Sequence, residues 1–416
     1  MNVEIIAVGN EVVFGHTTNT NASFMARELE TIGAEVCFHT AIRDRKKDIE
    51  DALEIAKNRV DTIILCGGLG PTKDDITKEV TCEFFGLEMS GSVHKRSYDR
   101  IVDYFAKINK PMHETNIKQA LFPKQTIVLD NDFGTAPGCI LFVEQTTVVL
   151  LPGPPKELHP MFAQVVKKYL KTDVHCITEE VRLFGIGESQ LATKIDDLLG
   201  VFDNVEVAPY IGEGFLSIRV RAKGTDINAL QEQAKFYTKS ICERLEEYVV
   251  GNTSKNIEET IYELLSEREF SISTAESCTG GLLAGRLVNN SGASQIFNEG
   301  FITYSNDSKI NLLGVKQTTL ETYGAVSEQV AIEMAQGAKK RANSNIAIST
   351  TGIAGPTGGT EEKPVGLVYV GIVSDTLTKA YKLNLRGQRQ EIRQMAVAYV
   401  LHHLYNFIIR GGENNG

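Results

Sequence analysis

The sequence predicts an α/β protein of three domains, and three observations lead to this prediction. The chain has 416 residues, more than one hydrophobic core usually serves. Strand-like and helix-like segments alternate over residues 1–172, which predicts a mostly parallel sheet covered by helices on both faces. The pattern changes twice further along the chain. We therefore expect a three-layer α/β/α domain over 1–172, a small α+β connecting domain over 173–251 and an α/β/α domain over 252–416.

The elements of the first domain follow from apolar periodicity and from capping residues. Val3–Val8 is an apolar run typical of a buried strand. Asn21 is expected to cap a helix that Gly33 ends. Further strands are expected at 36–40, 61–65, 139–143 and 147–151, with a helix at 49–56.

The connecting domain is expected to hold two alternating strands, 205–208 and 216–222, between helices at 190–199 and 227–245. Gly251–Ser254 is the expected linker to the third domain. Asn256, with Glu259 three residues later, predicts a capping box at the first helix of that domain. A long helix over 390–409 is expected near its end.

Charge and cysteine usage exclude several classes of protein. The net charge is −10 and the pI is near 5.5, which argues against a protein that tracks nucleic-acid phosphates with a basic face. The seven cysteines form no C-x-x-C pair, so neither a zinc cluster nor a disulfide framework is indicated. No apolar stretch approaches the ~18 residues of a membrane span, and no signal peptide is apparent. We expect a cytoplasmic protein that binds neither nucleic acid nor membrane.

A glycine-rich loop in the first domain suggests a phosphate site. The segment 67–79 follows a strand and is expected to open a helix, where glycines allow close approach of backbone N–H groups to a phosphate. Asp74 and Asp75 lie in this segment and would repel a phosphate unless a divalent cation lay between them. The alternative is that both carboxylates only offset the dipole of the helix.

Three polar, glycine-bearing segments of the third domain predict a second pocket. They cover residues 274–281, 292–309 and 350–366, and each borders an apolar strand or helix. In the first segment, Gly280 and Gly281 precede a helix over 282–288 and could bind a phosphate through their N–H groups. The third segment could direct N–H groups at a developing oxyanion.

The chemistry of this pocket points to a lysine as the general base. The only histidines after residue 175 are His402 and His403, both inside the last helix, so no Ser–His–Asp set is apparent. A lysine can accept a proton when desolvation lowers its pKa. Ser294 with Lys309 fits this arrangement, and Tyr304 could orient the proton. Alternatively, Ser294 only caps a helix beginning at residue 295, and Lys309 is a solvated helix residue.

The motifs of the first domain resemble those of the CinA family. These motifs are Gly-Asn-Glu-Val-Val-Phe-Gly (9–15), Asn-Thr-Asn (19–21), Gly-Gly-Leu-Gly-Pro-Thr-Lys-Asp-Asp-Ile-Thr (67–77), Gly-Thr-Ala-Pro-Gly (134–138) and Pro-Gly-Pro-Pro-Lys-Glu (152–157). The resemblance implies a MoaB/MogA-like fold and a pyrophosphatase acting on ADP-ribose, dependent on Mg²⁺ or a similar divalent cation, with K⁺ as a further possible ion. Family members usually have Asp where this chain has Asn19. The residues implied at the site are Asp74, Asp75 and Glu11 for the metal, and Gly67, Gly68, Gly70 and Thr72 for the phosphates.

The motifs of the third domain resemble the CinA C-terminal domain, which also occurs alone as the PncC-type nicotinamide mononucleotide deamidase. They are Ala-Glu-Ser-Cys-Thr-Gly-Gly (275–281), Thr-Tyr-Ser-Asn (303–306) with the lysine at 309, Gly-Ala-Val-Ser (324–327), Thr-Gly-Ile-Ala-Gly-Pro (351–356) and Lys-Pro-Val-Gly (363–366). The resemblance implies hydrolysis of nicotinamide mononucleotide to nicotinic acid mononucleotide and ammonia, without a cofactor. It implies Ser294 as nucleophile, Lys309 as base, and Tyr304 and Thr351 as supporting groups. The residues expected to bind the substrate are Ser277, Thr279, Gly280, Gly281, Gly352, Gly355 and Arg389.

Three questions are open at the level of sequence: the nucleophile, the role of the connecting domain and the class of function. Ser277 is the second choice as nucleophile, and Cys278 the third, since a small buried cysteine usually only packs. The connecting domain resembles the KH-like domain of CinA proteins but lacks a basic G-x-x-G loop at Gly185–Glu188, so a spacer or homodimerisation role is favoured. The alternative functions are a nucleotidyl transferase of the molybdenum-cofactor type and a non-catalytic competence- or damage-associated protein.

Overall fold

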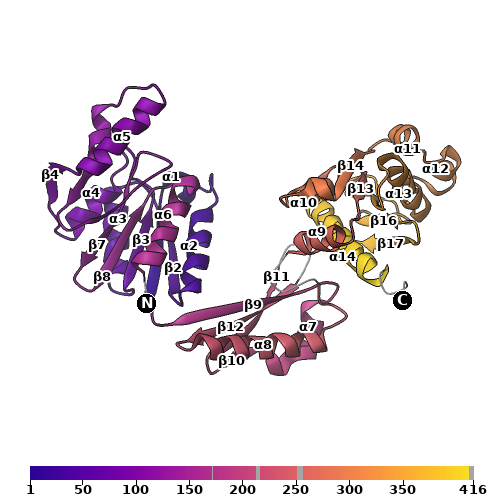
Figure 1. The fold of residues 1–416 in the computed structure, drawn as a ribbon, viewed down its shortest axis with the longest axis horizontal. Helices are drawn as coiled ribbons and strands as arrows, with labels where there is room; N and C mark the ends of the chain where they lie inside the picture. Colours follow the sequence, from indigo (N-terminus) through magenta and orange to yellow (C-terminus); the bar gives the residue numbers. More distant parts are fainter. Residues whose placement is uncertain (171, 212–215, 251–255, 412–416) are drawn as a thin grey trace. The chain divides into compact units, whose positions relative to one another are not determined.

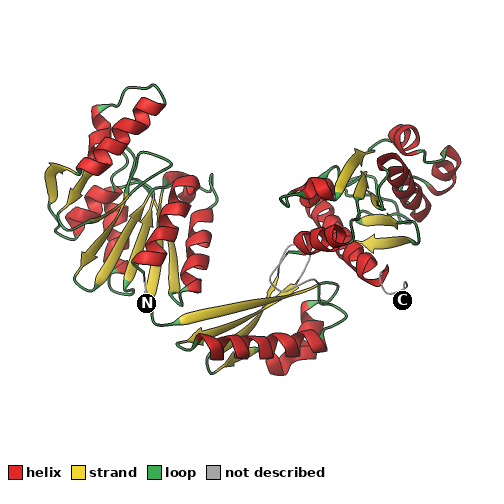
Figure 2. Ribbon diagram, in the orientation of Figure 1, coloured by secondary structure: helices red, strands yellow, loops and turns green. Residues whose placement is uncertain are grey.

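The computed structural model describes residues 1–170, 172–211, 216–250 and 256–411, so the expected linker Gly251–Ser254 lies outside the described residues. Helices and strands mix throughout this part of the chain, as Figures 1 and 2 show, which confirms the predicted α/β class. By its internal packing the chain forms two compact units, Met1–Ile177 with Ala222–Gln231, and Thr178–Arg221 with Glu232–Gly416. None of the described helices combines the length and apolarity that crossing a bilayer requires.

A six-stranded sheet is the centre of the first domain. β1 pairs in parallel with β2 and β3, and β3 pairs in parallel with β8, whereas β7 and β6 run antiparallel to their neighbours. The carboxyl ends of the parallel strands therefore meet at one edge. The order across the sheet is β2 (Glu35–Ile42), β1 (Asn2–Val8), β3 (Thr62–Cys66), β8 (Thr146–Leu151), β7 (Gly138–Val143) and β6 (Ile127–Leu129).

Helices cover both faces of this sheet, as predicted. Alternate strand residues pack on two separate apolar clusters, because successive side chains of a strand point to opposite faces. On one face lie α2 (Thr20–Thr31) and α6 (Pro155–Lys168), and on the other α3 (Lys46–Ala56) and α4 (Thr77–Phe84). Short α1 (Asn10–Val13) follows β1.

A small subdomain is inserted between α4 and β6. It contains the antiparallel pair β4 (Met89–Val93) and β5 (Leu121–Pro123), with α5 (Lys95–Lys107) and the 3₁₀ helix η1 (Glu114–Ala120) between them. The η1 helix ends close to the glycine-rich loop, because Lys78 Nζ from α4 donates to the carbonyl of Lys118 at 2.9 Å.

The capping residue of α2 differs from the prediction. Asn19, and not Asn21, is the N-cap, and its Oδ1 accepts a hydrogen bond from the Ala22 N–H at 3.1 Å. Asn21 lies inside the helix and donates through Nδ2 to the Gly153 carbonyl at 2.7 Å. Two asparagines within three residues made either of them a plausible cap.

The connecting domain has four strands in the order β10-β11-β12-β9, together with two α-helices. The expected strands and helices are all present, and β9 and β10 were not predicted. The bounds are β9 (His175–Leu183), α7 (Glu188–Ile195), η2 (Asp196–Leu198), β10 (Gly200–Phe202), β11 (Val205–Ile211), β12 (Leu216–Gly224) and α8 (Ile227–Arg244).

The third domain is built on a five-stranded sheet. β13 lies between β14 and β15 and pairs in parallel with both, and β16 and β17 extend the sheet in antiparallel fashion. As in the first domain, the parallel strands bring their carboxyl ends to one edge. The order is β14 (Phe297–Ile302), β13 (Ile272–Glu276), β15 (Ile346–Gly352), β16 (Leu367–Val373) and β17 (Thr378–Asn384).

Two helical layers complete the third domain. One apolar cluster joins the sheet to α9 (Ile257–Glu267), α10 (Leu282–Val288) and α14 (Arg389–Gly411). A second cluster joins the opposite face to α11 (Asn306–Leu313), α12 (Gln317–Tyr323) and α13 (Glu328–Ala342). The predicted capping box of Asn256 and Glu259 begins α9.

The packing of this sheet generates a prediction about stability. Ile348 is fully buried on β15, so Ile348→Ala should lower the free energy of unfolding of the third domain by about 2–5 kcal/mol through lost burial and a cavity. Ile302 of the same sheet is 58% exposed, and Ile302→Ala should change it by less than about 0.5 kcal/mol. Urea unfolding followed by hydrogen exchange of β15 peptides measures both. Equal losses in the two variants would contradict the assigned burial.

Candidate functional site

The first domain has a cavity of about 440 Å³ at the carboxyl ends of its parallel strands. Its wall is formed by the residues that follow β1, β3 and β8, where ligands of open α/β sheets usually bind. Of the predicted residues, Glu11, Gly67, Gly68, Gly70, Asp74 and Asp75 line the cavity, and Thr72 does not.

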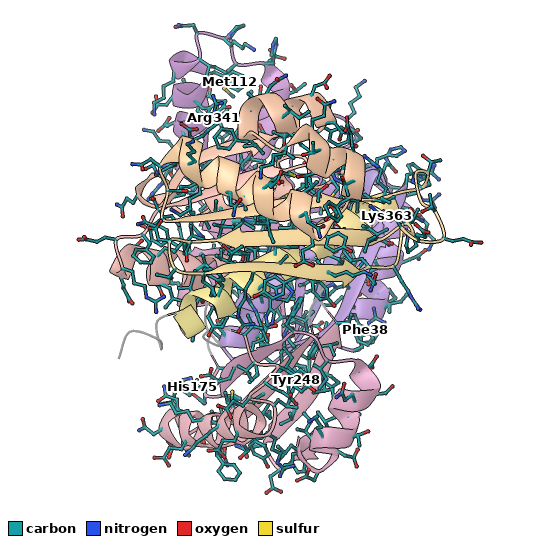
Figure 3. The ribbon with its side chains drawn as sticks, turned by 90° about the vertical axis from the view of Figure 1, so that its right-hand side faces the viewer. Phe38, Met112, His175, Tyr248, Arg341 and Lys363 are labelled. Atoms are coloured by element: carbon teal, nitrogen blue, oxygen red, sulfur yellow. The ribbon has the colours of Figure 1, made fainter. Side chains whose placement is uncertain are left out.

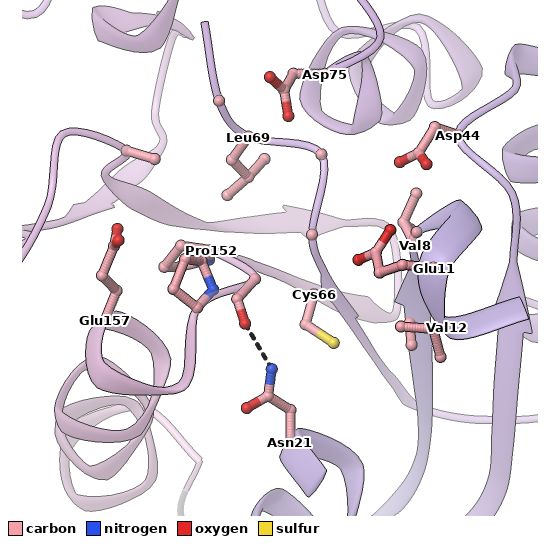
Figure 4. A pocket seen from close by; sticks show the side chains of 18 of the residues that line it. Val8, Glu11, Val12, Asn21, Asp44, Cys66, Leu69, Asp75, Pro152 and Glu157 are labelled. Atoms are coloured by element: carbon pink, nitrogen blue, oxygen red, sulfur yellow. Dashed lines mark hydrogen bonds between the residues drawn. The ribbon is translucent and has the colours of Figure 1, made fainter. Parts of the chain in front are cut away.

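This cavity is strongly acidic. Five carboxylates and no lysine, arginine or histidine are found among the described residues that line it. Asp44, which follows β2, lies on the same side of the cavity as Glu11 (Figure 4). Burial, together with the negative charges of Glu11 and Asp74, raises the pKa of the Asp44 carboxyl. The five carboxylates are Glu11, Asp44, Asp74, Asp75 and Glu157.

The predicted position of the two aspartates at a helix start is wrong. α4 begins at Thr77, so Asp74 and Asp75 lie in the preceding turn. Thr72 holds both of them, because its hydroxyl contacts an oxygen of each carboxylate and its N–H donates to Asp75 at 2.9 Å. The hydrogen bond from Thr72 lowers the pKa of Asp74. Lys118 fixes the same turn by donating to the Thr72 and Asp75 carbonyls, each at 2.6 Å.

The lining of this cavity suits a hard divalent cation. Carboxylate oxygens are the ligands that Mg²⁺ prefers, and Mg²⁺ usually takes one or two of them together with phosphate oxygens of a ligand. Among the described residues, no three His, Cys, Asp or Glu side chains form a ready-made cluster. Glu11, Asp44 and Asp74 are carboxylates of this wall whose oxygens could serve as donors to such a cation.

The third domain has a cavity of about 280 Å³ at the carboxyl ends of β13 and β15. The three polar segments that the sequence singled out do meet here, since each contributes lining residues. Seven predicted residues line the cavity, namely Ser277, Tyr304, Lys309, Thr351, Gly352, Gly355 and Arg389.

Lys309 and Ser277 are in hydrogen-bond contact in this cavity. Lys309 lies on α11, is 1% exposed, and its Nζ donates to Ser277 Oγ at 3.1 Å. The same nitrogen lies 2.9 Å from the Thr303 carbonyl and 3.5 Å from the Tyr304 carbonyl. No carboxylate lies among the described residues lining the cavity, and burial lowers the pKa of the Lys309 ammonium. Burial thus makes this lysine easier to deprotonate than an exposed one.

In the structure Lys309 contacts Ser277 and not Ser294, its predicted partner. Ser294 is exposed in the short 3₁₀ helix η3 (Ala293–Gln295), and it does not line the cavity. Ser277, the second choice as nucleophile, makes the contact with Lys309. It directly follows β13, at the edge of the sheet where the carboxyl ends of the parallel strands meet. The expected helix after Ser294 is also absent, since β14 begins at Phe297.

The helix start predicted to bind a phosphate is already occupied. Glu276, 1% exposed, accepts hydrogen bonds from the N–H groups of Gly281, Leu283 and Ala284 at 2.8–3.1 Å. This internal carboxylate takes the position that an external anion would take at a helix N-terminus. Thr279, Gly280 and Gly281 do not line the cavity, and the buried Thr279 hydroxyl pairs with that of Thr350 at 2.7 Å.

Arg389 and Tyr304 close one side of the cavity. The Arg389 guanidinium donates to the Gly355 carbonyl at 2.7 Å and to the Tyr304 hydroxyl at 2.8 Å. Three segments distant in sequence are thereby linked at one point. Thr351 contributes less than predicted, because its hydroxyl donates to the Ala325 carbonyl at 2.7 Å.

Several lining residues were not predicted. Asn306, Val326 and Thr357 border the second cavity, and Asp44 borders the first. Asn306 and Thr357 stand within the segments that the sequence singled out, so their motifs could have indicated them. Lys363, labelled in Figure 3, holds the wall near Val326 by donating to the carbonyls of Tyr323 and Val326 at 2.6 and 2.8 Å.

Cys278 does not compete with Ser277. Its thiol is 6% exposed, and burial raises its pKa to about 12, so the thiolate that would act as nucleophile is suppressed. This agrees with its low rank from the sequence.

Sequence families match three successive parts of the chain. A probable molybdopterin binding domain matches residues 4–172, the damage-inducible protein CinA KH domain matches 178–251, and the CinA C-terminal domain matches 254–408. The competence-damage inducible protein of Clostridium acetobutylicum is 44% identical over 98% of this chain and 100% of its own length. That of Thermoanaerobacter pseudethanolicus is 41% identical over 98% of this chain and 99% of its own.

Solved structures also resemble parts of the chain. The competence/damage inducible protein CihA of Agrobacterium tumefaciens is 43% identical, covering 36% of this chain and 93% of its own, with a TM-score of 0.34. The protein CinA of Thermoplasma acidophilum is 30% identical, covering 41% of this chain and all of its own, with a TM-score of 0.38.

The fold and the matches define a multidomain α/β protein in which a MoaB-like domain, a KH-like connector and a CinA C-terminal domain follow one another. The chain belongs to the CinA family of competence-damage inducible proteins.

Proposed function

We propose that the third domain is an amidohydrolase that converts nicotinamide mononucleotide to nicotinic acid mononucleotide and ammonia. The observation that carries this proposal is the 3.1 Å contact between Lys309 Nζ and Ser277 Oγ inside a cavity. A serine hydroxyl beside an amine with a lowered pKa is an activated nucleophile, and amide hydrolysis needs one. The resemblance of the domain's motifs to the deamidase family supplies the substrate.

The charge of the cavity supports a ligand that carries a phosphate. Lys309 and Arg389 are the charged side chains among the described lining residues. Arg389 can bind phosphate oxygens with its fork of N–H donors, and the neighbouring Thr357 hydroxyl can add a further donor. The phosphate of a mononucleotide could therefore bind to Arg389 and Thr357 in the cavity that holds Ser277.

The contacts of Lys309 set the direction of proton transfer. Carbonyl groups can only accept hydrogen bonds, so the two N–H groups of a neutral amine point to Thr303 and Tyr304. In that neutral form the lone pair is free to accept from the Ser277 hydroxyl, the group to which the charged ammonium donates. In the reaction, Ser277 Oγ attacks the carboxamide carbon while Lys309 takes its proton. Lys309 passes that proton to the departing ammonia, and water hydrolyses the resulting acyl-serine.

The two serines can be separated by mutation. Ser277→Ala should reduce the kcat for ammonia release from nicotinamide mononucleotide by roughly 10³-fold or more, because it removes the attacking oxygen. Ser294→Ala should keep kcat near that of the wild type, because residue 294 lies outside the cavity. Ammonia release by the purified full-length chain measures both. The reverse pattern would assign the nucleophile to Ser294.

The protonation state of Lys309 generates a prediction about pH. Only the neutral amine can accept a proton, so kcat/KM should fall about tenfold per pH unit below the pKa of Lys309 and level off above it. Because burial lowers this pKa from its ordinary value of 10.5, the plateau should begin below that pH. Lys309→Arg keeps a cation that cannot release its proton and should be inactive throughout. An active Lys309→Arg enzyme would exclude the base role.

We further propose that the first domain hydrolyses the pyrophosphate of ADP-ribose with a divalent cation. Its five cavity carboxylates favour this, because they repel phosphate unless a cation screens them. The bound cation would supply charge neutralisation and polarisation of a phosphoryl oxygen. The chain's own contribution is the Gly67–Gly70 backbone against the ligand and the turn that Thr72 and Lys118 hold.

The acidic wall can be tested without measuring turnover. Asp44→Asn removes one negative charge from beside Glu11 and should weaken Mn²⁺ binding in the presence of ADP-ribose by roughly 10- to 100-fold. Asp51→Asn changes an exposed aspartate outside the cavity and should bind as the wild type does. Isothermal titration calorimetry measures both affinities. Equal Mn²⁺ affinity of the Asp44 variant and the wild type would refute the site.

A further inference from the structure

The turn that carries Ser277 is held from outside the cavity by an arginine of the last helix. Arg393 of α14 donates through Nε to the Cys278 carbonyl at 3.1 Å and through Nη2 to the Thr279 carbonyl at 2.8 Å. These carbonyls belong to the two residues that follow Ser277. Arg393 itself does not line the cavity.

The opposite side of the turn is held by a carboxylate. Glu276, the residue before Ser277, accepts the N–H groups of Gly281, Leu283 and Ala284. Its two oxygens serve three donors, so the start of α10 is tied back to the end of β13. The backbone is also left-handed at Gly280 (φ +58°) and Gly281 (φ +95°), which permits the sharp reversal.

The remaining backbone contact of Ser277 is made in the sheet. Its N–H donates to the Thr350 carbonyl at 2.9 Å. The hydroxyl oxygen is then placed by three anchors, namely the sheet, the Glu276 carboxylate and the Arg393 guanidinium. Of these, the guanidinium is the one contributed by α14.

We propose that Arg393 is a positioning residue, which fixes the Ser277 turn through the Cys278 and Thr279 carbonyls so that the hydroxyl stays against Lys309. This inference rests on the proposed amidohydrolase function. Geometry errors near 1 Å in a reacting group can cost roughly 100-fold in rate. A planar guanidinium that spans two neighbouring carbonyls restrains such shifts, whereas a single ammonium reaches one carbonyl well.

The test uses the full-length chain with Arg393→Met and Arg393→Lys. Arg393→Met should lower kcat for ammonia release roughly 10- to 100-fold with KM changed less than about twofold, because only positioning for attack is lost. The kcat of Arg393→Lys should lie between those of Arg393→Met and the wild type. If Arg393→Met does not fold, the kcat of Arg393→Lys tests the proposal.

Arg268→Met is the matched control. Arg268 also donates to a backbone carbonyl, that of Ile408 at 2.6 Å, within the same domain but away from the Ser277 turn. It should therefore lose one arginine–carbonyl contact and retain the wild-type kcat. A loss of kcat in Arg268→Met equal to that in Arg393→Met would show a general effect on folding and overturn the proposal.

A second measurement is independent of the substrate. Cys278 lies in the restrained turn and is buried, so alkylation by iodoacetamide should be slow in the wild type and in Arg268→Met. Release of the turn in Arg393→Met should speed alkylation of Cys278, quantified by mass spectrometry of its peptide, by about tenfold or more. If the wild type released no ammonia, the proposed function would fail, and alkylation would still decide the role of Arg393. Unchanged kcat or unchanged alkylation in Arg393→Met would each overturn it.

Discussion

The contact between the buried Lys309 amine and the Ser277 hydroxyl is the interaction on which the chemistry proposed for the third domain depends. It requires a lysine out of water, with no carboxylate among the described residues of the cavity to keep it charged. It also requires a serine hydroxyl at the end of β13, within hydrogen-bond distance of that lysine. The parallel pairing of β13 with β14 and β15 meets both needs, because it brings the end of one strand beside the segment that leads into α11.

Much of the fold could be predicted from the sequence because its signals are local. The capping box of α9, the apolar strands and the alternation of strands with helices all depend on residues near one another in the chain. The choice between Ser277 and Ser294 was not local. Both serines lie within polar, glycine-bearing segments, and only the strand order shows which of them meets Lys309. The role of Glu276 could not be predicted for a related reason. A glycine-rich helix start has the same sequence pattern whether or not a carboxylate of the chain accepts its N–H groups.

The two cavities occupy equivalent places in their sheets and have opposite electrostatic character. The first presents five carboxylates, and the second presents a lysine and an arginine. In the functions proposed above, equivalent topology receives a phosphate-bearing ligand in two ways, one through a bridging cation and one through direct donors. The lining of the first cavity could not be predicted completely from sequence motifs. Asp44 follows β2 outside those motifs, and it lines the cavity only because the fold brings the end of β2 there.

The occupation of the α10 N-terminus by Glu276 has a consequence for how ligands approach the third domain. With that dipole satisfied internally, the cationic side chains among the described lining residues are Arg389 and Lys309, and burial lowers the pKa of Lys309. An anionic ligand then meets a chain of net charge −10 with little long-range attraction. The ligand must therefore diffuse to the cavity against the repulsion of the net negative charge, which salt screens over about 8–10 Å. Selectivity then arises from short-range contacts inside the cavity.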